Sequence, residues 1–114
     1  MDERRAARLS GQIKREIASI LTREVKDPRL GFVSVVRVSL SQDGSHAKVY
    51  FSTMGSDEER EESCAAMESS KPYIRRLLAE RIRMRTVPEL QLIHDHSIEE
   101  GERVLRIIRS LEED

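Results

Sequence analysis

Two histidines and one cysteine are the residues of this sequence best suited to metal binding or nucleophilic catalysis. His94 and His96 flank Asp95 and would share one face of a strand. A catalytic zinc ion takes three protein ligands and a structural one takes four, but no third histidine lies near this pair and Cys64 is distant in sequence. We find no nucleophile elbow, P-loop or dinucleotide fingerprint. We therefore expect no enzymatic activity, no metal and no cofactor; a metal-dependent hydrolase at the two histidines is the one catalytic alternative.

The charged residues are more informative, because they form separate basic and acidic segments although the net charge is only −1. Residues 1–26 hold seven basic and four acidic residues, and residues 69–85 hold six basic and one acidic residue. Residues 56–68 hold six acidic residues and one basic residue. Salt confines each segment's field to about 8–10 Å, so two basic segments can form a phosphate-binding face on a nearly neutral protein. Solvated ion pairs on helix surfaces are the alternative explanation.

A first helix is predicted to position the first basic segment. Apolar residues recur at steps of three and four and form one helical face; they are Leu9, Ile13, Ile17, Ile20 and Leu21. Four basic residues lie on the opposite side of the helical wheel and are our first candidates for phosphate contacts; they are Arg4, Arg8, Arg15 and Lys26. The Asp27-Pro28 pair should end this helix, since proline disfavours helical geometry in the residue before it.

Three strands are predicted from segments rich in β-branched residues, at residues 32–40, 46–53 and 90–94. Val36, Val38 and Leu40 should share the buried face of the first strand. The Asp43-Gly44 pair favours a tight turn, so the first two strands form a hairpin. The second strand alternates cleanly, and its inward residues should be Ala47, Val49, Phe51 and Thr53.

A helix interrupted by Pro72 is predicted to position the second basic segment. Ser56 and Glu59 form a capping box that begins the helix, and Pro72 must break or kink it. We expect the kink at Ser70, Lys71 and Pro72, followed by a second helix over residues 73–85. Free N–H groups at the start of that second helix would suit a phosphate beside Lys71. An ordinary helical corner is the alternative.

The helical wheel divides the arginines of this second helix into outward-facing and inward-facing residues. Arg75, Arg76 and Arg83 lie outside the apolar stripe of the wheel and should be able to reach a partner. Arg81 and Arg85 fall on the stripe, so they should point inward or snorkel. An inward arginine needs a carboxylate such as Glu89 or Asp95, because an unpaired buried charge is destabilising; fraying of the helix before Arg85 is the alternative.

The complete pattern predicts one α+β domain over residues 1–114, with residues 1–6 frayed. A final amphipathic helix begins at a second capping box at residues 97–100 and carries apolar residues at positions 104, 105, 108 and 111. The helices should pack on one face of the three-stranded sheet, in the order α-β-β-α-(kink)-α-β-α. The sequence shows no secretory signal, no membrane span and only one cysteine, so we expect a cytoplasmic protein.

Several segments together resemble the ribosome-binding factor A family of bacterial assembly factors for the small ribosomal subunit. They are residues 24–30 (EVKDPRL), 33–40 (VSVVRVSL), 47–52 (AKVYFS), 73–75 (YIR), 83–85 (RMR), 88–90 (PEL) and 95–97 (DHS). The resemblance implies a type II KH-like fold, in which an Ala-x-Gly kink replaces the usual glycine-rich loop between helices. This sequence departs from that pattern, because Ser70, Lys71 and Pro72 occupy the kink.

The resemblance also implies a function. Family members bind the free small (30S) subunit and its 16S rRNA, assist late maturation of that RNA, matter most in the cold and are not enzymes. We therefore expect an RNA-binding protein, monomeric, with no membrane partner and no small-molecule substrate. Some members carry a longer basic tail; this sequence ends in acidic residues, so we expect a tail-dependent contact to be absent or different. The alternative is a protein-interaction adaptor that docks through residues 57–62 and the last helix.

Overall fold

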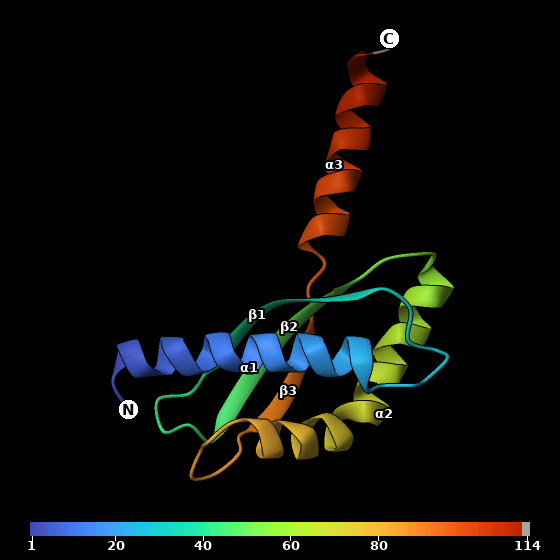
Figure 1. The fold of residues 1–114 in the computed structure, drawn as a ribbon. Helices are drawn as coiled ribbons and strands as arrows, with labels where there is room; N and C mark the ends of the chain where they lie inside the picture. Colours follow the sequence, from blue (N-terminus) through green and yellow to red (C-terminus); the bar gives the residue numbers. More distant parts are fainter. Residues whose placement is uncertain (113–114) are drawn as a thin grey trace.

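The computed structural model describes the backbone of residues 1–112 and the side chains of residues 1–96 and 104–112. Its elements follow the predicted order (Figure 1): α1 (Glu3–Arg23), β1 (Val33–Leu40), β2 (His46–Thr53), α2 (Asp57–Arg81), β3 (Glu89–His94) and α3 (Ser97–Glu112). The Asp2 carboxylate accepts a hydrogen bond from the Arg5 N–H and caps α1. Residues 3–6 therefore belong to α1, and the expected fraying of the first six residues stays a prediction.

The three strands form one mixed sheet in the order β1-β2-β3. β1 and β2 are an antiparallel hairpin, in which Val38 pairs with Val49. β3 runs parallel to β2, with Val49 opposite Leu92. Parallel neighbours need a long crossover, which α2 supplies. The observed α+β architecture is the expected KH-like one.

The core lies between this sheet and the helices α1 and α2, which both cover the same face (Figure 1). The α1 stripe is buried as predicted, and Ile13, Ile17 and Ile20 are completely inaccessible. The inward residues of β2 are buried too, from Ala47 to Thr53. Apolar residues of α2 close the core, among them Met67, Ile74 and Leu78.

One residue of β1 faces the other way from our expectation. The register between β1 and β2 shifts between Val35 and Arg37, which is a β-bulge. An extra residue in one strand reverses the side-chain alternation on either side of it. Val35 is therefore buried and Val36 is exposed, although Val36 was expected on the buried face with Val38 and Leu40.

Helix α2 is a single helix of 25 residues with Pro72 inside it. It changes direction in its middle (Figure 1), as expected from a proline that removes one backbone hydrogen bond and bends the helix. The expected second helix with its own free N-terminus is wrong, because helical geometry continues through Pro72. The helix also ends earlier than expected, at Arg81, so Arg83 and Arg85 lie in the loop before β3 rather than on a helix.

Helix α3 projects away from the sheet and from α1 and α2 (Figure 1). The sequence predicts that all helices pack on one face, but this holds only for α1 and α2. Large apolar side chains of α3 are consequently exposed: Val104, Leu105, Ile107, Ile108 and Leu111. Within residues 1–112, no helix combines the length and the apolar character needed to cross a membrane.

Candidate nucleic-acid interface

The loop of residues 82–88 carries Arg83 and Arg85 and is held to the rest of the protein at its first end. Arg81, the last residue of α2, lies 3.6 Å from the Glu16 carboxylate and donates a hydrogen bond of 3.2 Å to Glu24. The carboxylate pairing predicted for Arg81 is present, but Arg81 is exposed rather than inward. The expected partners Glu89 and Asp95 are wrong, because Arg81 turns toward α1.

Arg75 holds the second end of this loop. Its guanidinium donates hydrogen bonds to the carbonyl oxygens of Val87 (2.9 Å) and Pro88 (3.1 Å) and lies 3.4 Å from the Glu89 carboxylate. Arg75 is therefore engaged with this loop, and its expected contact with RNA stays a prediction. Its position one turn after Pro72 brings it over the chain before β3, where backbone carbonyl groups need a donor.

The same loop meets α1 and forms a basic hollow of about 540 Å³. Arg15 of α1 and Arg83 of the loop both line it, although 68 positions separate them in the sequence. Glu16 also lines the hollow, but its carboxylate lies beside Arg81. Arg15 and Arg83 form no ion pair among the described residues and remain available to an anion. The structure thus brings together one candidate from each basic segment.

A second hollow of about 400 Å³ adjoins the first and shares Arg83 with it. Residues from the start of α1, the β1–β2 turn and the 82–88 loop line it; these three segments lie on the left side of Figure 1. Arg5 and Arg85 also line it. The expected inward direction of Arg85 is wrong, because the helix ends before it and its side chain is exposed.

The remaining candidates lie outside these two hollows. Arg4 and Arg8 are exposed on α1, and Lys26 is exposed in the segment after α1. Lys71, beside the buried Ser70 and the exposed Pro72, lies 3.4 Å from Glu68. Arg76 is exposed, and its guanidinium lies 5.1 Å from the centre of the Tyr73 ring. Their role in RNA binding stays a prediction.

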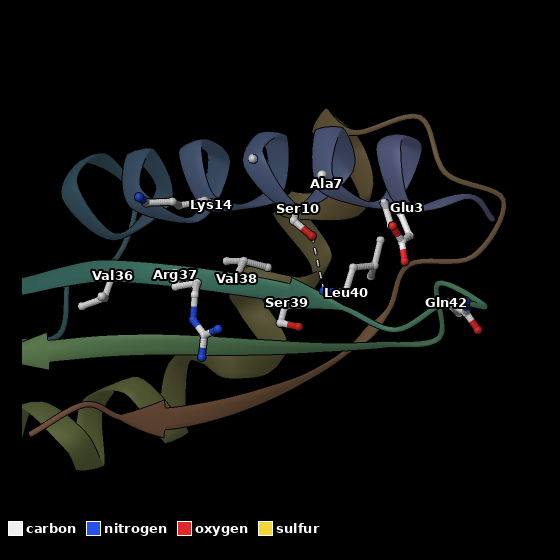
Figure 2. Close-up of a pocket in the computed structure, with 12 residues that line it drawn as sticks. Glu3, Ala7, Ser10, Lys14, Val36, Arg37, Val38, Ser39, Leu40 and Gln42 are labelled. Carbon is white, nitrogen blue, oxygen red and sulfur yellow. Dashed lines mark hydrogen bonds between the residues drawn. The ribbon is translucent and has the colours of Figure 1, made fainter. Parts of the chain in front are cut away.

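A third hollow, of about 510 Å³, runs between α1 and the outer edge of β1 (Figure 2). Small residues of α1 line it, and the Ser10 hydroxyl accepts a hydrogen bond of 3.3 Å from the Leu40 N–H. Arg37 points away from α1, and its guanidinium lies 4.1 Å from the centre of the Tyr50 ring. Only Glu3 and Lys14 bring further charge, so this groove lacks the converging arginines of the other two.

Two turns, one after α1 and one between β1 and β2, are fixed by carboxylates. The Arg29 side chain donates hydrogen bonds to the Asp27 carboxylate, and the Arg29 backbone N–H donates another. These hydrogen bonds hold the pKa of Asp27 below its ordinary value. Hydrogen bonds from Ser45, and then from the Ser41 hydroxyl, lower the pKa of Asp43 far more. The Asp43 carboxylate therefore stays ionised, and its hydrogen bonds are made to residues of its own turn.

The histidine pair shows packing contacts within the described part of the chain. The His94 ring stacks on Phe51 at 5.3 Å between centres, and its Nε2 lies 3.0 Å from the Thr53 hydroxyl. The His96 ring meets the His94 ring edge-on at 4.1 Å. Across the described residues, no three histidine, cysteine or acidic side chains gather as metal ligands would. Cys64, the single cysteine of the sequence, is half-buried.

Sequence reasoning missed Arg5 and misplaced Arg85. Arg5 lies on the flank of α1 that also carries Leu9 and Gln12, so it faces the 82–88 loop rather than the far side of the helix. The helical wheel could have predicted the direction of Arg5, but it could not predict that the 82–88 loop packs beside that flank of α1.

Comparisons with known proteins agree with this fold. The sequence profile of the family described as ribosome-binding factor A matches residues 5–108. A ribosome-binding factor A from Heliobacterium modesticaldum is 47% identical over 108 residues, which cover 95% of this chain and 89% of the relative. The crystal structure of ribosome-binding factor A from Thermus thermophilus is 32% identical, with a TM-score of 0.69, over 78% of this chain and 94% of that one.

A further similar structure is a homology model of Thermus thermophilus ribosome-binding factor A, fitted into a cryo-electron-microscopy map of a 30S–ribosome-binding factor A complex. It is 32% identical, with a TM-score of 0.67, and the alignment covers 80% of this chain and 96% of that one. Both the sequence profile and the close relative span most of the chain. This chain therefore belongs to the ribosome-binding factor A family.

Proposed function

We propose that this protein binds the free small ribosomal subunit in the cytoplasm through its 16S rRNA and assists late maturation of that RNA, above all in the cold. It acts as a monomer, as a single KH-like RNA-binding domain, by binding and not by catalysis. The observation that carries the proposal is the convergence of Arg15 and Arg83 on one hollow, in a chain whose relative is described in a 30S complex.

The arginines around the two adjoining hollows would contact RNA phosphates. Arg5, Arg15, Arg83 and Arg85 supply this charge, and Arg4 and Arg8 extend it along α1. Guanidinium groups pair with phosphate oxygens in a bidentate manner. Phosphate contacts position a protein but carry little sequence information, so specificity would come from the shape of the RNA and the ribosome. Lys26, Lys71 and Arg76 are further candidates, and Arg75 is better explained as a structural residue.

Sedimentation tests this proposal directly. Purified protein would be mixed separately with isolated small subunits, isolated large subunits and assembled ribosomes, then layered on sucrose gradients at low salt. We expect the protein to travel with free small subunits alone. Its absence from the small-subunit fractions, or equal binding to all three particles, would contradict the proposal.

A second candidate function is protein docking, because the apolar side chains of α3 are exposed and the acidic start of α2 is exposed too. A pull-down on immobilised protein, with and without nuclease, separates the two functions. Partners retained after complete RNA digestion would favour docking, whereas their loss would favour RNA binding.

A further inference from the structure

We propose that the hollow shared by the start of α1, the β1–β2 turn and the 82–88 loop binds one unpaired nucleotide of an RNA strand. Its phosphate would lie against Arg5, Arg83 and Arg85, and its base against the apolar wall. This inference rests on the proposed function and adds a specific subsite to it. The subsite is separate from the bend in α2.

The charge of the hollow favours an anion. Arg5, Arg83 and Arg85 line it, and none of the three guanidinium groups forms an ion pair within the part of the chain that the structure describes. Asp43 is the one carboxylate in the lining. Its Oδ1 already accepts hydrogen bonds from the Ser41 hydroxyl (2.8 Å) and from the Ser45 N–H and hydroxyl (3.0 and 2.7 Å). The arginines therefore have no internal carboxylate to satisfy them.

The apolar part of the lining favours a flat ring beside that anion. Leu9, Met1 and Met84 line the same hollow. Both methionine methyl groups lie over the buried Gly44: a Cβ built on Gly44 would be 3.3 Å from the Met1 methyl and 3.9 Å from that of Met84. Methionine side chains adapt in shape and make favourable contacts with aromatic rings. Arginine next to such a wall can also stack on a base.

The size and position of the hollow fit one nucleotide rather than a duplex. About 400 Å³ lies within the range of small-ligand sites, and it is far too small for a helical groove contact. Thr86 and the backbone of the β1–β2 turn add polar groups at the rim. Arg83 also lines the neighbouring hollow with Arg15, so the next phosphate of the same strand has a place to bind.

Methionine methyl groups provide a local readout of this site. The protein has four methionines: Met1 and Met84 line the hollow, Met67 is in the core, and Met54 is exposed outside the lining. Protein with ¹³C-labelled methionine methyls would be titrated with AMP, adenosine and inorganic phosphate in separate NMR experiments. We expect AMP to shift the Met1 and Met84 signals together and to leave those of Met54 and Met67 in place.

The three probes separate the parts of the proposed ligand. Adenosine and inorganic phosphate should each need at least five times the half-saturating AMP concentration. Equal binding of phosphate and AMP would show a simple anion site and overturn the nucleotide proposal. Shifts of Met54 equal to those of Met84 would show non-specific binding and would also overturn it.

A matched pair of variants tests the arginines. Arg85→Gln should raise the half-saturating AMP concentration about five- to tenfold, whereas Arg23→Gln, an equal charge change in the last turn of α1, should leave it unchanged. Both residues are exposed, so folding is maintained. If small subunits bind normally but millimolar AMP moves no methyl signal, the nucleotide subsite is wrong while the proposed function stands. If small-subunit binding fails in sedimentation, the proposed function itself is wrong.

Discussion

Neutralising Arg15 and Arg83 together should reduce the salt dependence of small-subunit binding by a calculable amount. Four arginines surround the two adjoining hollows. Each phosphate neutralised contributes about 0.7–0.9 to the slope of log affinity against log salt. Arg5, Arg15, Arg83 and Arg85 would together contribute a slope of about −2.8 to −3.6. The variant Arg15→Ala/Arg83→Ala should lose half of this, about 1.4–1.8.

The assay measures affinity for isolated small subunits between 50 and 200 mM monovalent salt at constant magnesium. Over this fourfold range, the two missing contacts correspond to about a 7–12-fold smaller loss of affinity in the variant than in the wild type. The control is Arg106→Ala/Arg109→Ala on α3, which removes the same charge from an exposed helix that projects away from both hollows. Equal slopes for the two double variants would refute the assignment of Arg15 and Arg83 to RNA phosphates.

Three predictions concern stability and are measured by urea unfolding. Arg75→Met should lower the free energy of unfolding by about 1–2 kcal/mol, because the carbonyl groups of residues 87 and 88 lose a charged donor; an unchanged midpoint would contradict this role. Ile17→Ala should cost about 2–5 kcal/mol, since Ile17 is completely buried, and a cost below about 1 kcal/mol would mean that the core is looser than described. Asp43→Asn should lower the free energy of unfolding at neutral pH but not in strong acid. Folding lowers the pKa of Asp43, so the ionised carboxylate stabilises the protein at pH values above its ordinary pKa of 3.8. This stabilisation is lost as the pH falls further below 3.8. A wild-type advantage that stays constant from pH 6 to pH 2 would contradict that role.

Much of the fold could be predicted because it depends on local patterns. The buried stripe of α1 follows from spacing alone, and the capping box of Ser56 and Glu59 is present as expected. The exposed Val36 could not be predicted, because a β-bulge depends on how two strands pair and leaves no periodic signal in one of them. The direction change of α2 follows from Pro72, but whether helical geometry continues through it depends on packing against α1 and the sheet.

The candidate site was harder to predict because it is made of residues distant in sequence. A helical wheel describes the direction of a side chain only while the helix lasts, so the early end of α2 at Arg81 changed the directions of Arg83 and Arg85. The wheel also could not identify the acceptors of Arg75, which are backbone carbonyl groups of a loop. Charge clustering indicated the two basic segments, but only the fold shows that Arg15 and Arg83 line the same hollow.

The two arginine anchors of the 82–88 loop have a thermodynamic consequence for recognition. Arg81 ties the loop to α1 at one end, and Arg75 ties it to the chain before β3 at the other. The entropy of ordering the loop backbone is thus lost when the protein folds, and association has only to immobilise the side chains, at about 0.5–1.5 kcal/mol each. Such preorganisation couples affinity to the internal architecture: releasing either anchor would free the loop and weaken the proposed association with RNA.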